Sequence, residues 1–132
     1  MPEMKCIVVT PETTVLEQTA QFVALPLYDG EIGIAPRHSP LIGRLGYGEL
    51  RLVNGDVTTR YYVDGGFVQV KDDVISVLTN RAMPAAKIDR QVAEEQLATA
   101  RARKVTTDEL LAIRDRQEAQ ARAQIRVERR AH

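Results

Sequence analysis

The sequence predicts an α+β fold in which an antiparallel β-sandwich over residues 1–85 is followed by an antiparallel two-helix hairpin over residues 86–132. Before Pro84, short apolar and β-branched runs are separated by turn residues at intervals of roughly 8–12 residues, a spacing typical of sandwiches and barrels. Beyond that proline the chain has neither Gly nor Pro and is rich in Ala, Glu, Gln, Arg and Leu, which favour helix.

Several short segments of the first part have strand character. We expect strands at 5–9, 15–17, 20–27, 49–53, 57–63, 67–70 and 74–78. Residues 49–53 alternate polar and apolar side chains, which is the pattern of a strand with one face in water. Asn54-Gly55 follows, and because both residues tolerate a positive φ, this pair predicts a tight hairpin that joins 49–53 to 57–63.

Residues 30–41, GEIGIAPRHSPL, contain two glycines and two prolines within an otherwise strand-like half. Glycine serves where the backbone needs a positive φ or a close approach, and proline where φ is held near about −65°. We therefore expect one shaped loop here rather than an interrupted hydrophobic strand. His38, the one titratable ring in this loop, lies between Arg37 and Ser39 and is expected on the surface.

The last part of the chain divides into two helices. The first is expected from Ile88 to about Lys104. Thr106 and Glu109 have the spacing of a capping box, in which the two side chains satisfy each other's free amides, and a second helix of about 24 residues follows. Because the connection is short, the two helices are expected to be antiparallel.

The second helix has few bulky apolar side chains for permanent packing. After Leu110, Leu111 and Ile113, the sequence offers Ala, Gln and Arg until Ile125 and Val127. Burying so few large side chains, at about 1.5–3 kcal/mol each, barely offsets the about 1–2 kcal/mol of backbone entropy lost per ordered residue. We therefore predict that the hairpin detaches when a partner offers a competing surface.

The composition excludes several classes of function. The formal net charge is zero, because residues 1–85 hold seven Lys/Arg against ten Asp/Glu and residues 86–132 hold eleven against eight. A basic segment without aromatic residues offers little for stacking on bases, so no nucleic acid partner is expected. No stretch approaches the about 18 apolar residues of a membrane span, so we expect no direct membrane insertion. The single cysteine, Cys6, lies in an apolar run and is expected to be buried.

No catalytic signature is present in the sequence, since it lacks a phosphate loop, an HExxH motif, a Cys/His cluster and a GxSxG elbow. The histidines are His38 and His132, so neither a metal site nor a His-based triad is expected. Because a nucleophile, a base and an orienting group would all be needed together, we predict that the chain is not an enzyme by itself.

Four arginines of the second helix, Arg114, Arg122, Arg126 and Arg130, recur at multiples of four residues and form a stripe that winds slowly around it. Two interpretations of this stripe remain open on spacing alone. A solvated face is the commoner meaning of such a charge run, whereas the alternative is a docking face for an acidic partner.

Three stretches make the chain resemble the epsilon subunit of the bacterial F-type rotary ATP synthase, which is called delta in mitochondria. Residues 30–41 match the family pattern GE(L/I)GI-x-P-x-H-(A/S)-PL. Residues 63–70, VDGGFVQV, match its GG-centred strand pair, and Ile88-Asp89 matches the beginning of its first helix. The resemblance covers nearly the whole chain.

The resemblance implies a ten-stranded β-sandwich, a helical hairpin and a non-catalytic place in the central stalk, peripheral to the cytoplasmic face of the bacterial inner membrane. The sandwich would join the gamma subunit to the c-ring, with Glu31, Ile32 and His38 at that interface, so that proton-driven rotation is coupled to ATP synthesis. The hairpin would extend toward the alpha/beta catalytic head, where Arg114, Arg122 and Arg126 would meet acidic loops and restrain ATP hydrolysis.

Some members of the family bind ATP through an (I/L)DxxRA motif. The matching residues here are Ile88-Asp89-Arg90-Gln91-Val92-Ala93, with Val92 where arginine is expected, and Met83 stands where those members have a glutamate. Losing a cation that pairs with phosphate should weaken binding by several kcal/mol. We therefore expect weak or absent ATP binding and no other cofactor.

Two alternatives to a rotor subunit follow from the residues alone. One is a free-standing β-sandwich binding module whose helical tail mediates oligomerisation. The other, a small hydrolase, would require turnover by the isolated chain. Co-purification separates the first from a rotor subunit, since a rotor subunit forms a stable complex with a long coiled-coil partner.

Overall fold

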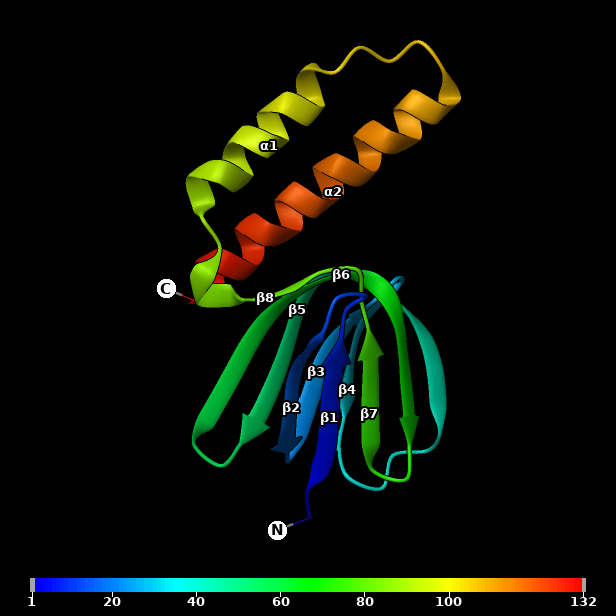
Figure 1. Cartoon of the computed structure of the whole chain (residues 1–132), viewed down its shortest axis with the longest axis vertical. Helices are drawn as coiled ribbons and strands as arrows, with labels where there is room; N and C mark the ends of the chain where they lie inside the picture. The colour runs from blue at the N-terminus through cyan, green and yellow to red at the C-terminus, as the bar shows by residue number, and fades with distance from the viewer. Residues whose placement is uncertain (1, 132) are drawn as a thin grey trace.

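The computed structural model describes residues 2–131 as a β-sandwich with a helical hairpin at one end (Figure 1). The strands are β1 (Met4–Val9), β2 (Thr14–Ala20), β3 (Phe22–Leu27), β4 (Gly30–Ile34), β5 (Leu41–Asn54), β6 (Val57–Lys71), β7 (Val74–Leu78) and β8 (Ala82–Pro84). A short 3-10 helix, η1 (Ala85–Lys87), leads into α1 (Arg90–Ala102) and α2 (Asp108–Ala131). The predicted fold class is confirmed, but the described residues form an eight-stranded sheet rather than the ten strands that the resemblance implied.

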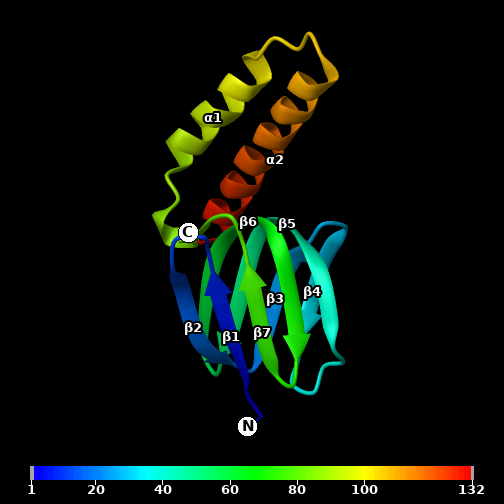
Figure 2. The same ribbon diagram turned by 45° about the vertical axis from the view of Figure 1, so that its right-hand side comes forward.

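The strands form one hydrogen-bonded sheet in the order β2-β1-β7-β6-β5-β3-β4, with β8 paired to β6. This sheet folds over so that β1 and β7 lie in front of β3 (Figures 1 and 2). The β1–β7 pair is parallel, so the prediction of a purely antiparallel sandwich was wrong for this pair. The N-terminal strand β1 lies between β2 and β7, and its long-range pairing with β7 has no local signal in the sequence.

Strands β5 and β6 are the longest of the molecule, and both bend from one layer of the sandwich into the other. The sequence predicted separate strands at 57–63 and 67–70, whereas the structure has one continuous strand across Gly65 and Gly66. Both glycines have a positive φ, of 69° and 104°, which turns the strand without ending it. The β5–β6 pairing keeps the same register before and after this bend, from Leu41 opposite Val70 to Asn54 opposite Val57.

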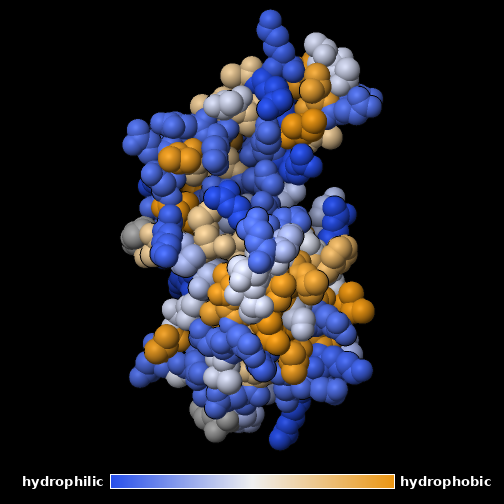
Figure 3. Space-filling model, viewed as in Figure 1, coloured by the Kyte–Doolittle hydropathy of each residue, from blue (hydrophilic) through white to orange (hydrophobic). Residues whose placement is uncertain are grey.

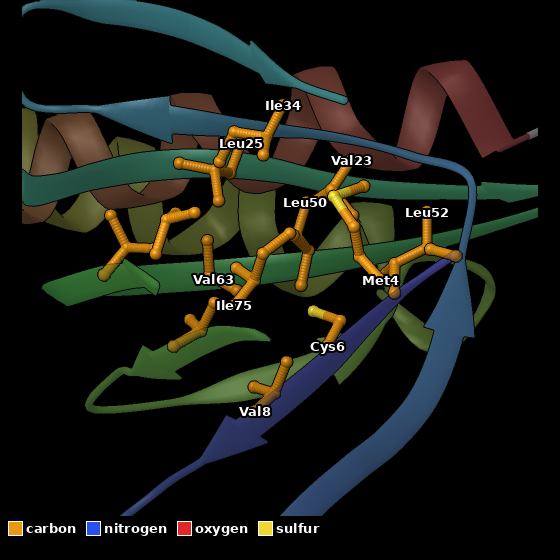
Figure 4. Packing of buried hydrophobic residues seen from close by; sticks show 14 of the residues in the cluster. Met4, Cys6, Val8, Val23, Leu25, Ile34, Leu50, Leu52, Val63 and Ile75 are labelled. Carbon is orange, nitrogen blue, oxygen red and sulfur yellow. The ribbon is translucent and has the colours of Figure 1, made fainter. Parts of the chain in front are cut away.

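The core lies between the two layers and is built by alternate residues of almost every strand (Figure 4). In the close-up, Met4, Cys6 and Val8 of β1 point into the space between the layers. The other labelled residues are Ile75 of the neighbouring strand β7, Val23 and Leu25 of β3, Ile34 of β4, Leu50 and Leu52 of β5, and Val63 of β6. The predicted burial of Cys6 is confirmed, because none of its surface is exposed.

Both helices begin at a side chain that accepts a hydrogen bond from the first turn. Asp89 caps α1 by accepting from the Val92 amide at 3.2 Å, so the helix begins two residues later than predicted. In α2 the acceptor is Thr107, which takes the Leu110 amide at 3.1 Å. The capping box predicted at Thr106 and Glu109 was therefore wrong, because the cap lies one residue later and Leu110 has no side-chain acceptor to return the bond. Within residues 2–131, neither helix is both long and apolar enough to span a membrane.

Candidate functional site

The sequence predicted a single shaped loop over residues 30–41, but the structure has an edge strand followed by a loop. Residues 30–34 form β4 and pair with β3, while 35–40 connect β4 to β5. Glu31 lies beside the β3–β4 turn and is exposed, whereas Ile32 is turned inward and is half-buried against the core. His38 lies in the loop beyond the other end of β4. The structure therefore does not bring Glu31 and His38 together.

The loop at 35–40 owes its shape to contacts that the sequence did not predict. Arg37 has a φ of 67°, unusual for a residue other than glycine, and its amide donates to Asp73 Oδ1 at 2.6 Å. Asp73 belongs to the β6–β7 turn, where it also has a positive φ, of 61°. His38 is half-buried, with Nδ1 2.7 Å from the carbonyl oxygen of Ser39. His132 lies outside the described residues.

Apolar side chains gather on the outer face of the sandwich, across β5, β6 and β7 (Figure 3). Phe67 is 60% exposed and lies directly opposite the exposed Leu78, while Ile42 on β5 is 77% exposed. At the margin, the Arg44 guanidinium lies 4.5 Å from the centre of the Tyr28 ring. We call Ile42, Phe67 and Leu78 the apolar stripe. Contiguous exposed apolar side chains of this kind mark contact surfaces between proteins.

The hairpin rests on the sandwich through a second apolar cluster. Its buried members are Tyr62, Ala85, Ile88, Ala123 and Val127, with Tyr47, Met83 and Ala131 packed at the margin. The ring of Tyr62 has no exposed surface and is the largest fully buried side chain in the molecule. Burial, followed by the carboxylate of Asp64, raises the pKa of Tyr62 above its usual range, while Gln124 and Arg81 oppose the shift.

Polar contacts flank this cluster on both sides. Gln120 of α2 donates from Nε2 to both carboxylate oxygens of Asp64 on β6, at 3.0 and 3.3 Å. Near the end of α2, Nη1 of Arg130 lies 3.8 Å from Oε1 of Glu49 on β5. Glu49 is only 5% exposed, and the sequence did not single it out because a lone glutamate on an alternating strand indicates a solvated position.

Arg114, Arg122 and Arg126 lie on α2, and Arg114 and Arg122 form ion pairs with carboxylates of the same helix. Glu118 lies between the first two along the helix, 4.0 Å from Arg114 and 3.6 Å from Arg122. Arg114 also approaches Asp115 at 3.7 Å, and Arg126 is exposed. Pairs of this kind four residues apart stabilise a helix by only about 0.2–0.5 kcal/mol each, so the arginines remain open to exchange of partners.

The residues of the degenerate nucleotide motif do not share one environment. Ile88 is buried in the second apolar cluster, Asp89 caps α1, and Ala93 is buried, whereas Val92 is 45% exposed. Val92 lines a cleft of about 460 Å³ between the helices and the sandwich. The other lining residues are Asp64, Arg81, Glu95, Gln96, Thr99, Ala100, Arg103, Gln117, Gln120 and Gln124. Two cations and two carboxylates balance, so the cleft has no net charge to attract a polyphosphate.

Comparison with known proteins agrees with this architecture. Residues 3–85 match the family described as the ATP synthase delta/epsilon chain, beta-sandwich domain. The ATP synthase epsilon chain of Rhodopirellula baltica is 48% identical over 126 residues, which cover 96% of this chain and 98% of the relative. The epsilon chain of Granulibacter bethesdensis is 39% identical over 111 residues, covering 83% of this chain and 82% of the relative.

The fold is also found in solved assemblies. A chain in the cryo-EM structure of the Euglena gracilis mitochondrial ATP synthase, OSCP/F1/c-ring, superimposes with a TM-score of 0.81 and 24% identity. That match covers the whole of this chain and 83% of the other. With the extended sequence matches across both the sandwich and the helices, these findings confirm the resemblance seen in three motifs, and the chain belongs to the ATP synthase delta/epsilon chain family.

Proposed function

We propose that the chain is a non-catalytic subunit of the central stalk of an F-type ATP synthase, where it couples rotation of the c-ring through gamma to ATP synthesis. The observation that carries this proposal is the 48% identity to an ATP synthase epsilon chain over nearly the full length of both proteins. The complex would hold the chain on the cytoplasmic face of a bacterial inner membrane.

The sandwich, residues 1–85, is proposed as the part that contacts the rotor. The apolar stripe supports a permanent protein contact, because three large apolar side chains on one sheet face would otherwise stay in water. We assign this stripe to gamma. Glu31 and Ile32 on edge strand β4, with His38 in the following loop, form the proposed contacts with the c-ring and the adjoining part of gamma.

Co-purification tests this assignment. Replacing Phe67 and Leu78 together by serine should abolish co-purification with gamma while leaving the isolated chain folded, because both side chains already lie in water. Val57 is a matched control, since it is similarly exposed but lies at the β5–β6 turn, away from the stripe. If the Phe67 and Leu78 variant still assembled normally, the stripe would not be the gamma contact. Self-association without gamma would instead support the free-standing binding module.

The hairpin, residues 86–132, is proposed as a brake on ATP hydrolysis. Undocked from the sandwich, it would extend toward the catalytic head and present Arg114, Arg122 and Arg126 to acidic loops. Its polar contacts and small buried alanines support reversible docking. Deleting residues 86–132 in the assembled enzyme should therefore raise ATP hydrolysis, whereas unchanged hydrolysis would leave only the coupling role of the sandwich.

A second comparison isolates the arginines from the rest of the hairpin. Replacing Arg114, Arg122 and Arg126 by glutamine should raise hydrolysis in the assembled enzyme, because the charge-assisted contacts to the head are lost. Replacing Arg101 and Arg103, which are exposed on and just after α1, removes positive charge without touching the proposed docking face. An equal effect of both sets would indicate a general charge effect and contradict the docking assignment.

A further inference from the structure

The contact between hairpin and sandwich combines a small apolar cluster with polar contacts at its edges. From α2, the buried apolar contribution is Ala123 and Val127, which close over the ring of Tyr62. An alanine and a valine bury little area, so the apolar cluster alone gives α2 a weak hold on the sandwich. The polar contacts at the edges therefore decide how firmly the hairpin stays docked.

The contact between Gln120 and Asp64 is stronger than the contact between Arg130 and Glu49. The amide donates to a charged acceptor at 3.0 and 3.3 Å, and both side chains are partly shielded from water. Hydrogen bonds to charged groups contribute more than neutral ones. The Arg130–Glu49 approach is longer, at 3.8 Å, and the arginine is largely exposed, so it is the weaker contact.

Neither Glu49 nor Asp64 becomes an unpaired buried charge when the hairpin leaves the sandwich. Glu49 retains Arg60 at 2.9 Å and Arg51 at 3.4 Å, both from the sandwich itself, so loss of Arg130 does not leave the buried carboxylate without a cation. Asp64 is only half-buried and its carboxylate gains water when Gln120 departs. Undocking thus avoids the penalty of an unpaired buried carboxylate, which would otherwise make release very costly.

We propose that the Gln120–Asp64 contact is the latch that sets the docking equilibrium of the hairpin, with Arg130–Glu49 as an auxiliary contact. This inference rests on the detachable hairpin of the proposed function and names the residues that regulate it. The latch holds the hairpin to the sandwich on the side of the interface that borders the cleft. The hairpin turns about the apolar cluster around Tyr62 when the latch opens. Once released, a helix as short as α1 is marginal in water, so its amides should lose protection.

Hydrogen exchange of the isolated full chain tests the latch. Gln120→Glu places a second carboxylate against Asp64 and should increase exchange of residues 90–131 by about tenfold, while the strands keep their protection. Gln117→Glu is the matched control, because it makes the same charge change three positions earlier on α2, in the same cleft. Arg130→Gln should increase exchange by only about twofold, and Arg126→Gln should leave it unchanged.

Rescue separates a broken latch from a damaged fold. Asp64→Asn combined with Gln120→Glu restores an amide opposite a carboxylate and should return the exchange of residues 90–131 to within about twofold of wild type. Equal exchange in the Gln120→Glu and Gln117→Glu variants, or no rescue by the double change, would overturn the latch. Wild-type helices as protected as the strands would also overturn it, because no undocking equilibrium would exist. Since the isolated chain is measured, absence of a brake in the assembled enzyme would leave these results unaffected.

Discussion

Nη1 of Arg60 on β6 lies 2.9 Å from Oε1 of the buried Glu49 on β5, and Arg51 approaches the same oxygen at 3.4 Å. Arg51 and Arg60 are directly opposite each other in the β5–β6 pair. Like charges in that position repel, so the carboxylate of Glu49 both gains two cations and relieves their repulsion. The three side chains form a charge cluster within the sandwich.

Glu49→Gln should lower the free energy of unfolding by about 1–3 kcal/mol, because the two arginines then face each other without a carboxylate between them. Urea unfolding followed by circular dichroism measures the change. Glu17→Gln is the control, since it removes the exposed ion pair with Lys5, at 2.6 Å, and should cost less than about 1 kcal/mol. Equal losses in both variants would contradict a special role for Glu49.

Gly66→Ala should prevent or severely weaken folding. A Cβ at this position would overlap the carbonyl oxygen of Leu78, and the φ of 104° is itself strained for other residues. We expect a loss of at least about 3 kcal/mol in urea unfolding. Gly55→Ala is the comparison, because its φ is also positive but no atom lies within 4 Å of the added carbon. If both variants lost only about 1 kcal/mol of unfolding free energy, β6 would have shifted to accept the methyl group at Gly66.

The stability of the chain should fall with rising pH partly through Cys6. Burial raises the pKa of this thiol from 9.0 to about 12, so the unfolded state releases its proton first and is stabilised. The contribution of the protonated Cys6 thiol to the free energy of unfolding is fully present below pH 9 and is lost between pH 9 and 12. From pH 9 to 10 the loss is about 1 kcal/mol.

Urea unfolding of the wild type and of Cys6→Ala at pH 8, 9 and 10 measures this contribution as a difference in slope. The range stops at pH 10 because the raised pKa of Tyr62 adds a loss of the same sign above its ordinary value of 10.0. If the two proteins lost stability equally from pH 9 to 10, the thiol would not be the cause.

ATP binding by the isolated chain should be weak, with no micromolar affinity in calorimetry. The cleft between helices and sandwich has balanced charges, and Val92 supplies no partner for a phosphate. Val92→Arg adds one cation to that cleft and should tighten binding by about tenfold. Val92→Gln, which adds a polar group without charge, should have little effect. Micromolar binding by the wild-type chain would contradict the prediction.

Much of the architecture follows from local pattern. The change from alternation to helix-forming residues after Pro84 predicts the order of strands and helices, and Asn54-Gly55 predicts the β5–β6 hairpin that the structure has. These signals are local because backbone preferences of a few neighbouring residues determine them. The family motif at 30–41 also stands in the sequence itself and required no coordinates.

The predictions made from the sequence are wrong where contacts with distant segments determine the local conformation. Residues 30–34 form a strand despite two glycines because β3 supplies a partner along its whole length. Similarly, Gly65 and Gly66 do not end β6, since β5 pairs with the strand on both sides of the bend, and β8 before it and β7 after it add further pairing. Glycine weakens a strand locally, but pairing on either side compensates for that loss.

The fold class, the two-part organisation, the absence of catalytic motifs and the family can all be predicted without coordinates, because composition, periodicity and motif spacing are properties of the chain. Three relationships become visible only in the folded molecule: Phe67 and Leu78 lie together in water, Glu49 is buried between arginines, and Gln120 reaches Asp64. Those three relationships join residues from different elements, and packing of the whole chain determines which distant side chains meet.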